Sequence, residues 1–118
     1  KDEAFEEIVA SEELEAARNT IKENPAVRDA YVRVIGFTGF GESGEAERSN
    51  FMSASVFLRQ DETHNEAMAK QFATVVLATY PEAKQDSQTV LLMSYGYDIG
   101  IFSRWSNRRY SFSKEELE

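Results

Sequence analysis

The sequence contains no cysteine, a single histidine, a single tryptophan and only two prolines among its 118 residues. Without cysteine, the chain cannot form disulfides, thiolate metal sites or a cysteine nucleophile. The histidine, His64, has no second histidine with which to form a metal pair. No apolar run approaches the roughly 18 residues that a membrane-spanning helix needs, so we expect no direct membrane insertion.

Positive charge is also scarce, because 13 Lys and Arg residues face 21 Asp and Glu residues, which gives a net charge of −8. This balance repels phosphate backbones and anionic lipid surfaces, so we expect no nucleic-acid partner. The hydrophobic fraction of 42% is sufficient for one compact domain over residues 1–118. The chain starts at Lys1 rather than Met, which slightly favours one domain of a larger, exported or anchored protein.

Two helices are predicted from hydrophobic periodicity and capping signals. The first is expected over residues 11–24, with Ser11 as its N-cap. Residues 1–10 are interpreted as one or two additional turns or a separate short helix with a frayed start. The second helix is expected to run from the capping-box sequence Thr63–Glu66 to about residue 80. Its wide apolar face indicates close packing against a sheet.

The remaining pattern predicts two hairpins, with strands over residues 26–40, 51–59, 88–95 and 99–105. The polar segment 41–50 is the expected loop of the first hairpin, and Gly96–Asp98 is the expected turn of the second. Residues 108–113 form a fifth strand, unless one long bent strand covers 99–112. The continuous apolar run Val90–Met93 is typical of a strand buried on both faces.

This order, α-β-β-α-β-β, predicts an α+β fold with a four- or five-stranded antiparallel sheet and two helices packed on one face. Residues 114–118 are either a tail or the start of a further helix. The other face of the sheet would then carry Phe37, Phe51 and Phe57 among Ser, Thr and Arg residues. A face with this composition is typical of a partner surface or of one covered by a second copy.

The strongest candidate for a site is an aromatic–arginine group in the C-terminal hairpin. Three arginines within six residues reverse the local sign of charge in an acidic chain, and guanidinium groups beside flat rings recognise carboxylates, phosphates or acidic surfaces. The alternative is that arginine stems lie over aromatic rings and pair with the chain's own glutamates. The candidate surface comprises Tyr95, Tyr97, Asp98, Arg104, Trp105, Arg108, Arg109 and Tyr110.

Other chemistry-bearing residues have simpler explanations. Asp98, between Gly96 and Gly100, is a candidate catalytic carboxylate or cation ligand, but a glycine-flanked Asp is typical of a turn. His64 precedes a helix and is expected to be exposed. The segment Gly36–Gly41 lacks the Lys-Ser/Thr pair and the helix that follow a phosphate loop. We therefore predict no catalytic residue, no cofactor and no metal site.

Together these patterns favour a non-catalytic interaction or ligand-binding module. Its partner would be a protein or a small anionic ligand, bound through the open sheet face and the C-terminal hairpin. The first alternative is a small enzyme or ligand-sequestering domain with a pocket near Asp98 and Arg104. The second is a structural domain that forms a homodimer through the sheet face or an edge strand.

Overall fold

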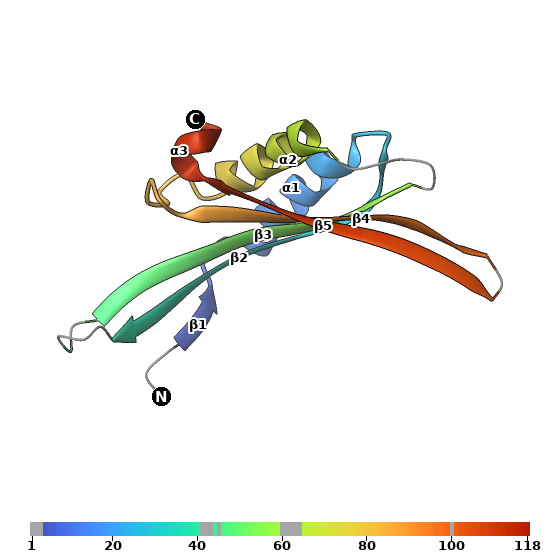
Figure 1. The fold of residues 1–118 in the computed structure, drawn as a ribbon. Helices are drawn as coiled ribbons and strands as arrows, with labels where there is room; N and C mark the ends of the chain where they lie inside the picture. The colour runs from blue at the N-terminus through green and yellow to red at the C-terminus, as the bar shows by residue number, and fades with distance from the viewer. Residues whose placement is uncertain (1–3, 41–43, 45, 60–64, 100) are drawn as a thin grey trace.

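The computed structural model describes residues 4–40, 44, 46–59, 65–99 and 101–118, and of residues 4–7, 37–40, 46–49, 97–99 and 102–103 it describes the backbone alone. These residues form an α+β fold (Figure 1). The elements in chain order are β1 (Ala4–Glu7), α1 (Ser11–Lys22), β2 (Val27–Phe40), β3 (Ala46–Leu58), α2 (Glu66–Ala78), β4 (Gln88–Ile99), β5 (Phe102–Ser113) and α3 (Lys114–Leu117).

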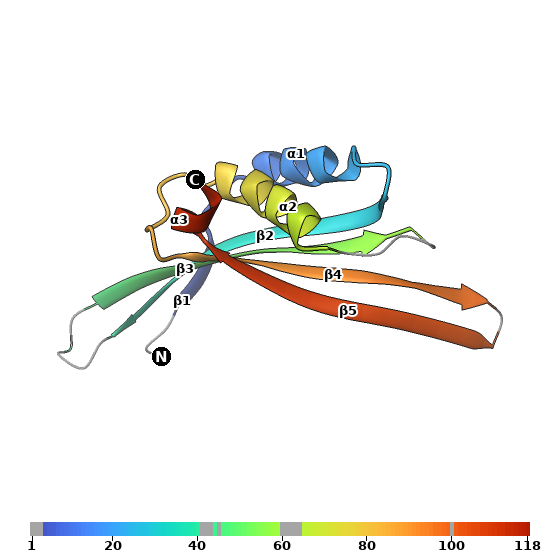
Figure 2. The ribbon, with the colours of Figure 1, turned by 45° about the horizontal axis from the view of Figure 1, so that its top comes forward.

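The predicted α-β-β-α-β-β order is confirmed within this longer series, and α1 and α2 lie together on one face of the sheet (Figure 2). The strands are arranged β1-β2-β3-β4-β5. The prediction of a purely antiparallel sheet is wrong at one position, because β3 and β4 are parallel. Helix α2 connects these two strands, and a crossover helix returns the chain to the same end of the sheet.

The helical prediction for residues 1–10 is also wrong, because Ala4–Glu7 forms a strand that pairs with Ile35–Thr38 of β2. A single helical turn fixes many dihedral angles for few hydrogen bonds, so it is unfavourable on its own. The distal half of β2 instead offers this segment a strand edge with which to pair. Helix α1 begins one residue earlier than the predicted cap implies, since its N-cap is Ala10 rather than Ser11.

The second helix begins at Glu66, and its N-cap is Asn65, whose side-chain oxygen accepts a hydrogen bond from the Met68 amide at 2.8 Å. Thr63, the first residue of the predicted capping box, and His64, which was predicted to be exposed, both lie outside the described residues. At the C-terminus, the predicted start of a further helix is confirmed as α3. Its N-cap Ser113 and Glu116 form a reciprocal capping box.

The turn predicted at Gly96–Asp98 is wrong, because β4 continues through these residues to Ile99. The alternative of one long C-terminal strand is the better description, since β5 runs without a break from Phe102 to Ser113. Gly96 is placed opposite Trp105 in this pairing. Gly96 therefore leaves space for the adjacent strand β5 and does not end β4.

The core lies between the two helices and the adjacent sheet face. Leu91 and Met93 are fully buried there, together with Phe72 of α2 and Ile21 of α1. Leu92 points to the other face and is 44% exposed, so the prediction that the run around it is buried on both faces is wrong at this residue. Alternation along β4 thus divides a uniformly apolar segment between a sealed face and an open one.

Both hairpins extend beyond the helices and bend away from them, so the molecule is an arch with the open sheet face on its inner side (Figures 1 and 2). The radius of gyration is 16.0 Å and the principal extents are 54 × 31 × 26 Å. A compact domain of this length would have a radius of gyration of about 13.5 Å. The extended hairpins account for the difference, and they leave much of the sheet uncovered.

Candidate functional site

The open face is built from side chains that align in rows across the strands. One row joins Tyr31 of β2, Ser55 of β3, Leu92 of β4 and Arg109 of β5, which are successive partners in the register. Because alternate residues of a strand point to the same face, these four side chains all lie opposite the helices. The large side chains of Tyr31 in β2 and Leu92 in β4 therefore stand on either side of Ser55 in the central strand β3.

This arrangement produces a trough along β3. Ser53 and Ser55 form its floor, and the hollow above them measures about 550 Å³. Tyr31 and Leu92 stand at its sides and are 55% and 44% exposed, while Phe51 at one end is 38% exposed. On the open face the hollow is lined by Tyr31, Arg33, Phe51, Ser53, Ser55 and Leu92. It is also lined by Leu14 of α1 and by Val32 and Val34 on the helix-facing side of β2, so it extends around β2 toward α1.

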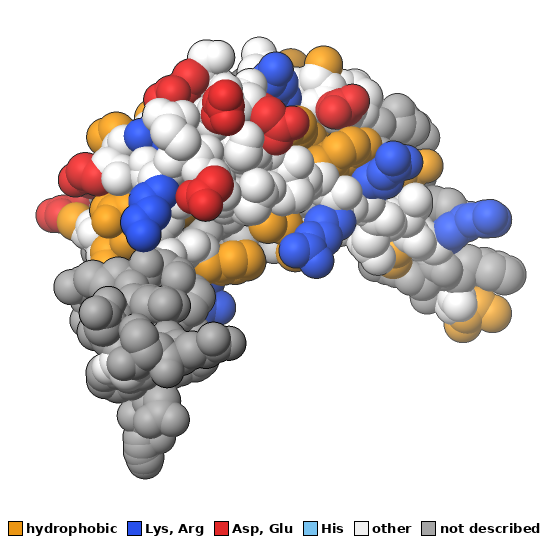
Figure 3. All heavy atoms as spheres, turned by 60° about the vertical axis from the view of Figure 1, so that its left-hand side comes forward, with side chains coloured by type: hydrophobic (Ala, Val, Ile, Leu, Met, Phe, Trp, Pro, Cys, Tyr) orange, Lys and Arg blue, Asp and Glu red, His pale blue; other side chains and the backbone are white. Residues whose placement is uncertain are grey.

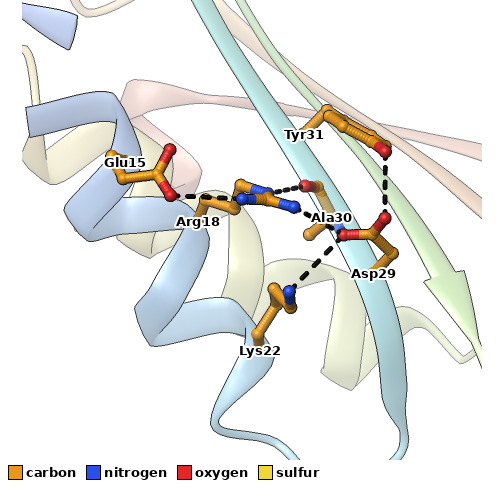
Figure 4. A network of polar contacts seen from close by, with 6 residues as sticks. All are labelled: Glu15, Arg18, Lys22, Asp29, Ala30 and Tyr31. Atoms are coloured by element: carbon orange, nitrogen blue, oxygen red, sulfur yellow. Dashed lines mark hydrogen bonds and ion pairs between the residues drawn. The ribbon is translucent and has the colours of Figure 1, made fainter. Parts of the chain in front are cut away.

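Tyr31 is held in place by a polar network that links α1 to β2 (Figure 4). Its hydroxyl donates to one Asp29 carboxylate oxygen at 2.9 Å, and Arg18 Nη2 donates to the other at 2.9 Å. The Arg18 guanidinium also lies 5.3 Å from the centre of the Tyr31 ring, and the Phe57 ring meets this ring edge-on at 6.2 Å. Several contacts therefore fix the Tyr31 ring as one wall of the trough.

The network shifts the ionisation of its members. The pKa of Asp29 is lowered to about 2, chiefly by the hydrogen bond from the Ala30 amide and then by those from Tyr31 and Arg18. The hydrogen bond to this carboxylate in turn raises the pKa of the Tyr31 phenol. Asp29 therefore stays ionised, and Tyr31 stays protonated, throughout the neutral range.

Replacing Asp29 with Asn is expected to remove a pH-dependent part of the stability. Because the folded-state pKa of Asp29, about 2, is below its ordinary value of 3.8, its stabilising contribution is present above about pH 4 and is lost as the pH falls toward 2. Urea unfolding of both proteins across this range should show the wild type's advantage shrinking with decreasing pH. A constant difference between the two would contradict this assignment.

Positive charge lies beside the trough on this side of the molecule. Arg33 and Arg109 are exposed on β2 and β5, and Arg109 also borders a second hollow of about 440 Å³ that Phe51 shares with the first. Among the described side chains on the strands of the open face, the carboxylate of Asp29 is the only acidic group, and it is already paired with Arg18. Figure 3 shows acidic side chains gathered instead over the helical layer at the top.

The structure does not bring the predicted aromatic–arginine group together on one surface. Trp105 and Arg109 lie on the open face, in register positions equivalent to Leu92. The helix-facing side carries the four members that alternate with them: Tyr95, Arg104, Arg108 and Tyr110. Of these, Tyr95 and Tyr110 pack against the core. These two sets of residues lie on opposite faces of the sheet, so the prediction that they form one surface is wrong.

Tyr97 and Asp98 complete the predicted group, and their side chains lie outside the described residues. Their backbone belongs to β4, where they pair with Arg104 and Ser103. The pocket predicted near Asp98 and Arg104 therefore stays a prediction.

Part of the alternative interpretation of the arginines agrees with the observed contacts. The Arg108 guanidinium lies 5.3 Å from the centre of the Tyr110 ring, and the Arg28 guanidinium lies at the same distance from the Trp105 ring. Pairing with the chain's own glutamates does not follow, since within the described residues no carboxylate forms an ion pair with Arg104, Arg108 or Arg109.

Sequence reasoning missed the trough, although Phe51 and the serines around it were assigned to the correct face. The signal was the alternation of Ser53 and Ser55 between phenylalanines, because two small residues in a central strand leave a depression beside larger neighbours. Leu92 was missed because a continuous apolar run conceals which of its members is exposed.

Comparison with protein-family models, with curated proteins and with solved structures found no match to this chain. Within the part that the structure describes, no group of three or more His, Cys, Asp or Glu residues is placed to bind a metal ion. No described helix is both long enough and apolar enough to cross a bilayer. The trough and the charges around it are therefore the basis for assigning a function.

Proposed function

We propose that the protein is a non-catalytic interaction module that binds a protein partner in the trough of its open sheet face. The observation that supports this most strongly is the exposure of Tyr31, Leu92 and Phe51, at 55%, 44% and 38%, around a floor of serines. Large apolar side chains that gather on one exposed face are typical of interaction surfaces. Rigid aromatic side chains of this kind are frequent binding anchors.

The chemistry of the trough favours binding over catalysis. Its lining residues include no carboxylate, histidine or lysine, so they supply no general acid or base that titrates near neutral pH. The trough is also open along one side, whereas small-molecule sites usually surround most of their ligand. A protruding apolar or aromatic side chain of another protein fits such a shape better than a small ligand does.

The charges around the trough define the partner further. Arg33 lies in its wall and Arg109 lies directly beside Leu92, whereas the carboxylate of Asp29 is engaged by Arg18. Arginine forks bind carboxylates in pairs of parallel hydrogen bonds. The partner is therefore a protein surface that presents Asp or Glu residues next to an aromatic or aliphatic side chain.

Filling the trough is expected to abolish this binding while preserving the fold. Random dodecapeptides displayed on phage would be selected on the wild-type chain and tested on Ser55→Trp, in which an indole ring replaces the serine on the floor. We expect the selected peptides to combine acidic and aromatic residues. We expect their affinity to fall by about tenfold or more, which corresponds to about 1.4 kcal/mol.

The matched control is Gln71→Trp, which adds the same ring at an exposed position of α2. Its binding should equal that of the wild type, and both variants should unfold cooperatively. Peptides that bind Ser55→Trp and the wild type equally would overturn the proposed site. Sedimentation tests the dimer alternative, because a wild-type dimer that Ser55→Trp converts to a monomer would assign the trough to a second copy.

A further inference from the structure

A second surface lies at the end of the sheet that β5 forms. We infer that the outer edge of β5 accepts an additional strand from an acidic, extended segment of a partner protein. This inference concerns the backbone of an edge strand rather than the trough, so it does not depend on the proposed function. It stands on the difference between the two edges of the sheet and on the charge of β5.

The edge along β2 is occupied at two places. Strand β1 pairs with Ile35–Thr38, and farther along the strand both backbone groups of Ala30 bond to side chains. The Ala30 carbonyl accepts from Arg18 Nε at 2.6 Å, and its amide donates to Asp29 at 2.8 Å (Figure 4). Side chains that occupy edge groups in this way prevent another strand from pairing there.

The edge along β5 is open by comparison. β5 is the last strand in the sheet order, and in the described part of the chain it pairs with β4 alone, over its whole length from Phe102 to Ser113. Much of this strand projects beyond the helices (Figure 2). Side chains are exposed on both of its faces, including Ser106 and Asn107 in its middle. An edge strand of this length presents a row of hydrogen-bonding groups to an extended segment.

Charge selects the kind of segment that would pair. Arg104 and Arg108 lie on the helix-facing side of β5, while Arg109 lies on the open side, and β5 contains no acidic residue. An added strand would therefore meet positive charge on both of its faces. Opposite charges on neighbouring strands stabilise pairing, and like charges destabilise it. A second copy of β5 would bring three more arginines to the same seam, so an acidic segment of a different protein fits better.

In the test, the dodecapeptides selected on the wild-type chain are grouped by the variant that weakens their binding, either Arg104→Ser/Arg108→Ser or Ser55→Trp. Peptides that use the edge should bind Arg104→Ser/Arg108→Ser at least about tenfold more weakly, yet bind Ser55→Trp like the wild type. They should carry Asp or Glu on both faces of an extended pattern. Methylating their backbone amides one at a time should weaken binding at every second residue, because alternate amides of a strand point toward its neighbour.

Hydrogen exchange on the unaltered protein gives a readout that needs no variant. Binding of an edge-class peptide should slow amide exchange within β5 and leave the amides of the trough floor in β3 unchanged. The inference is overturned if no selected peptide depends on Arg104 and Arg108. It is also overturned if backbone methylation has no alternating effect, or if β5 exchange stays the same. Any of these three results would mean that the arginines of β5 keep other strands away from this edge.

Discussion

Phe72→Ala is expected to lower the free energy of unfolding by about 3–5 kcal/mol, the largest stability change that we predict for a single side chain. Phe72 lies in the middle of α2 and is buried against the helix-facing side of the sheet, among side chains such as Leu91 and Met93. The cost has two parts: the burial of the ring is lost, and a cavity remains because the surrounding strands close around the gap only in part.

The loss would be severe, because a domain of this size has a total stability of roughly 5–15 kcal/mol. Urea unfolding followed by circular dichroism measures it directly. The neighbouring Gln71→Ala is the matched control, since Gln71 is exposed on the same helix and should change stability by less than about 0.5 kcal/mol. Equal stability of the two variants would show that α2 is not packed on the sheet as described.

Gly96→Ala is expected to be the most damaging change in the C-terminal hairpin. A Cβ atom at this position would collide with the carbonyl oxygen of Arg104, and it would lie 2.7 Å from the Cα and 2.8 Å from the Cδ2 of Trp105. Two of these atoms belong to the backbone of the paired strand, so β4 and β5 would have to separate locally. Overpacking of this kind typically costs about 1–3 kcal/mol.

Trp105 is the only tryptophan of the chain, so its fluorescence reports on this part of the hairpin alone. Gly96→Ala should shift the emission toward that of a solvent-exposed indole and lower the unfolding midpoint. The control is Ser94→Ala, two residues earlier on the same face of β4. An unchanged spectrum in Gly96→Ala would mean that the two strands are not in close contact there.

The class of the fold could be predicted from the sequence because it depends on periodicity, which is local. Residues 30–35 and 52–58 alternate with a period of two, and α2 shows a helical stripe. Strand β1 could not be predicted in this way. Phe5 in this strand and Ile8 just after it have a spacing that suits a helix. The observed strand depends instead on an edge of β2 about 30 residues away in the chain.

The candidate site was predicted in part for a related reason. The composition of the C-terminal hairpin correctly marked it as basic, but closeness in sequence does not place side chains on one surface. Arg108 and Arg109 are adjacent in the chain and lie on opposite faces of the sheet. The trough needed the register of four strands, and a strand register is set by contacts that no single segment contains.

The distribution of charge over the two layers has a consequence for how partners approach. Among the described side chains, acidic residues such as Glu12 and Glu13 lie on the helical side, and Arg33 and Arg109 lie on the side of the sheet. An acidic partner would be repelled by the helical side and attracted by the arginines of the sheet, which favours encounters at the open face. Because the whole chain has a net charge of −8, added salt would weaken its long-range repulsion of an acidic partner as well as the local attraction of the arginines.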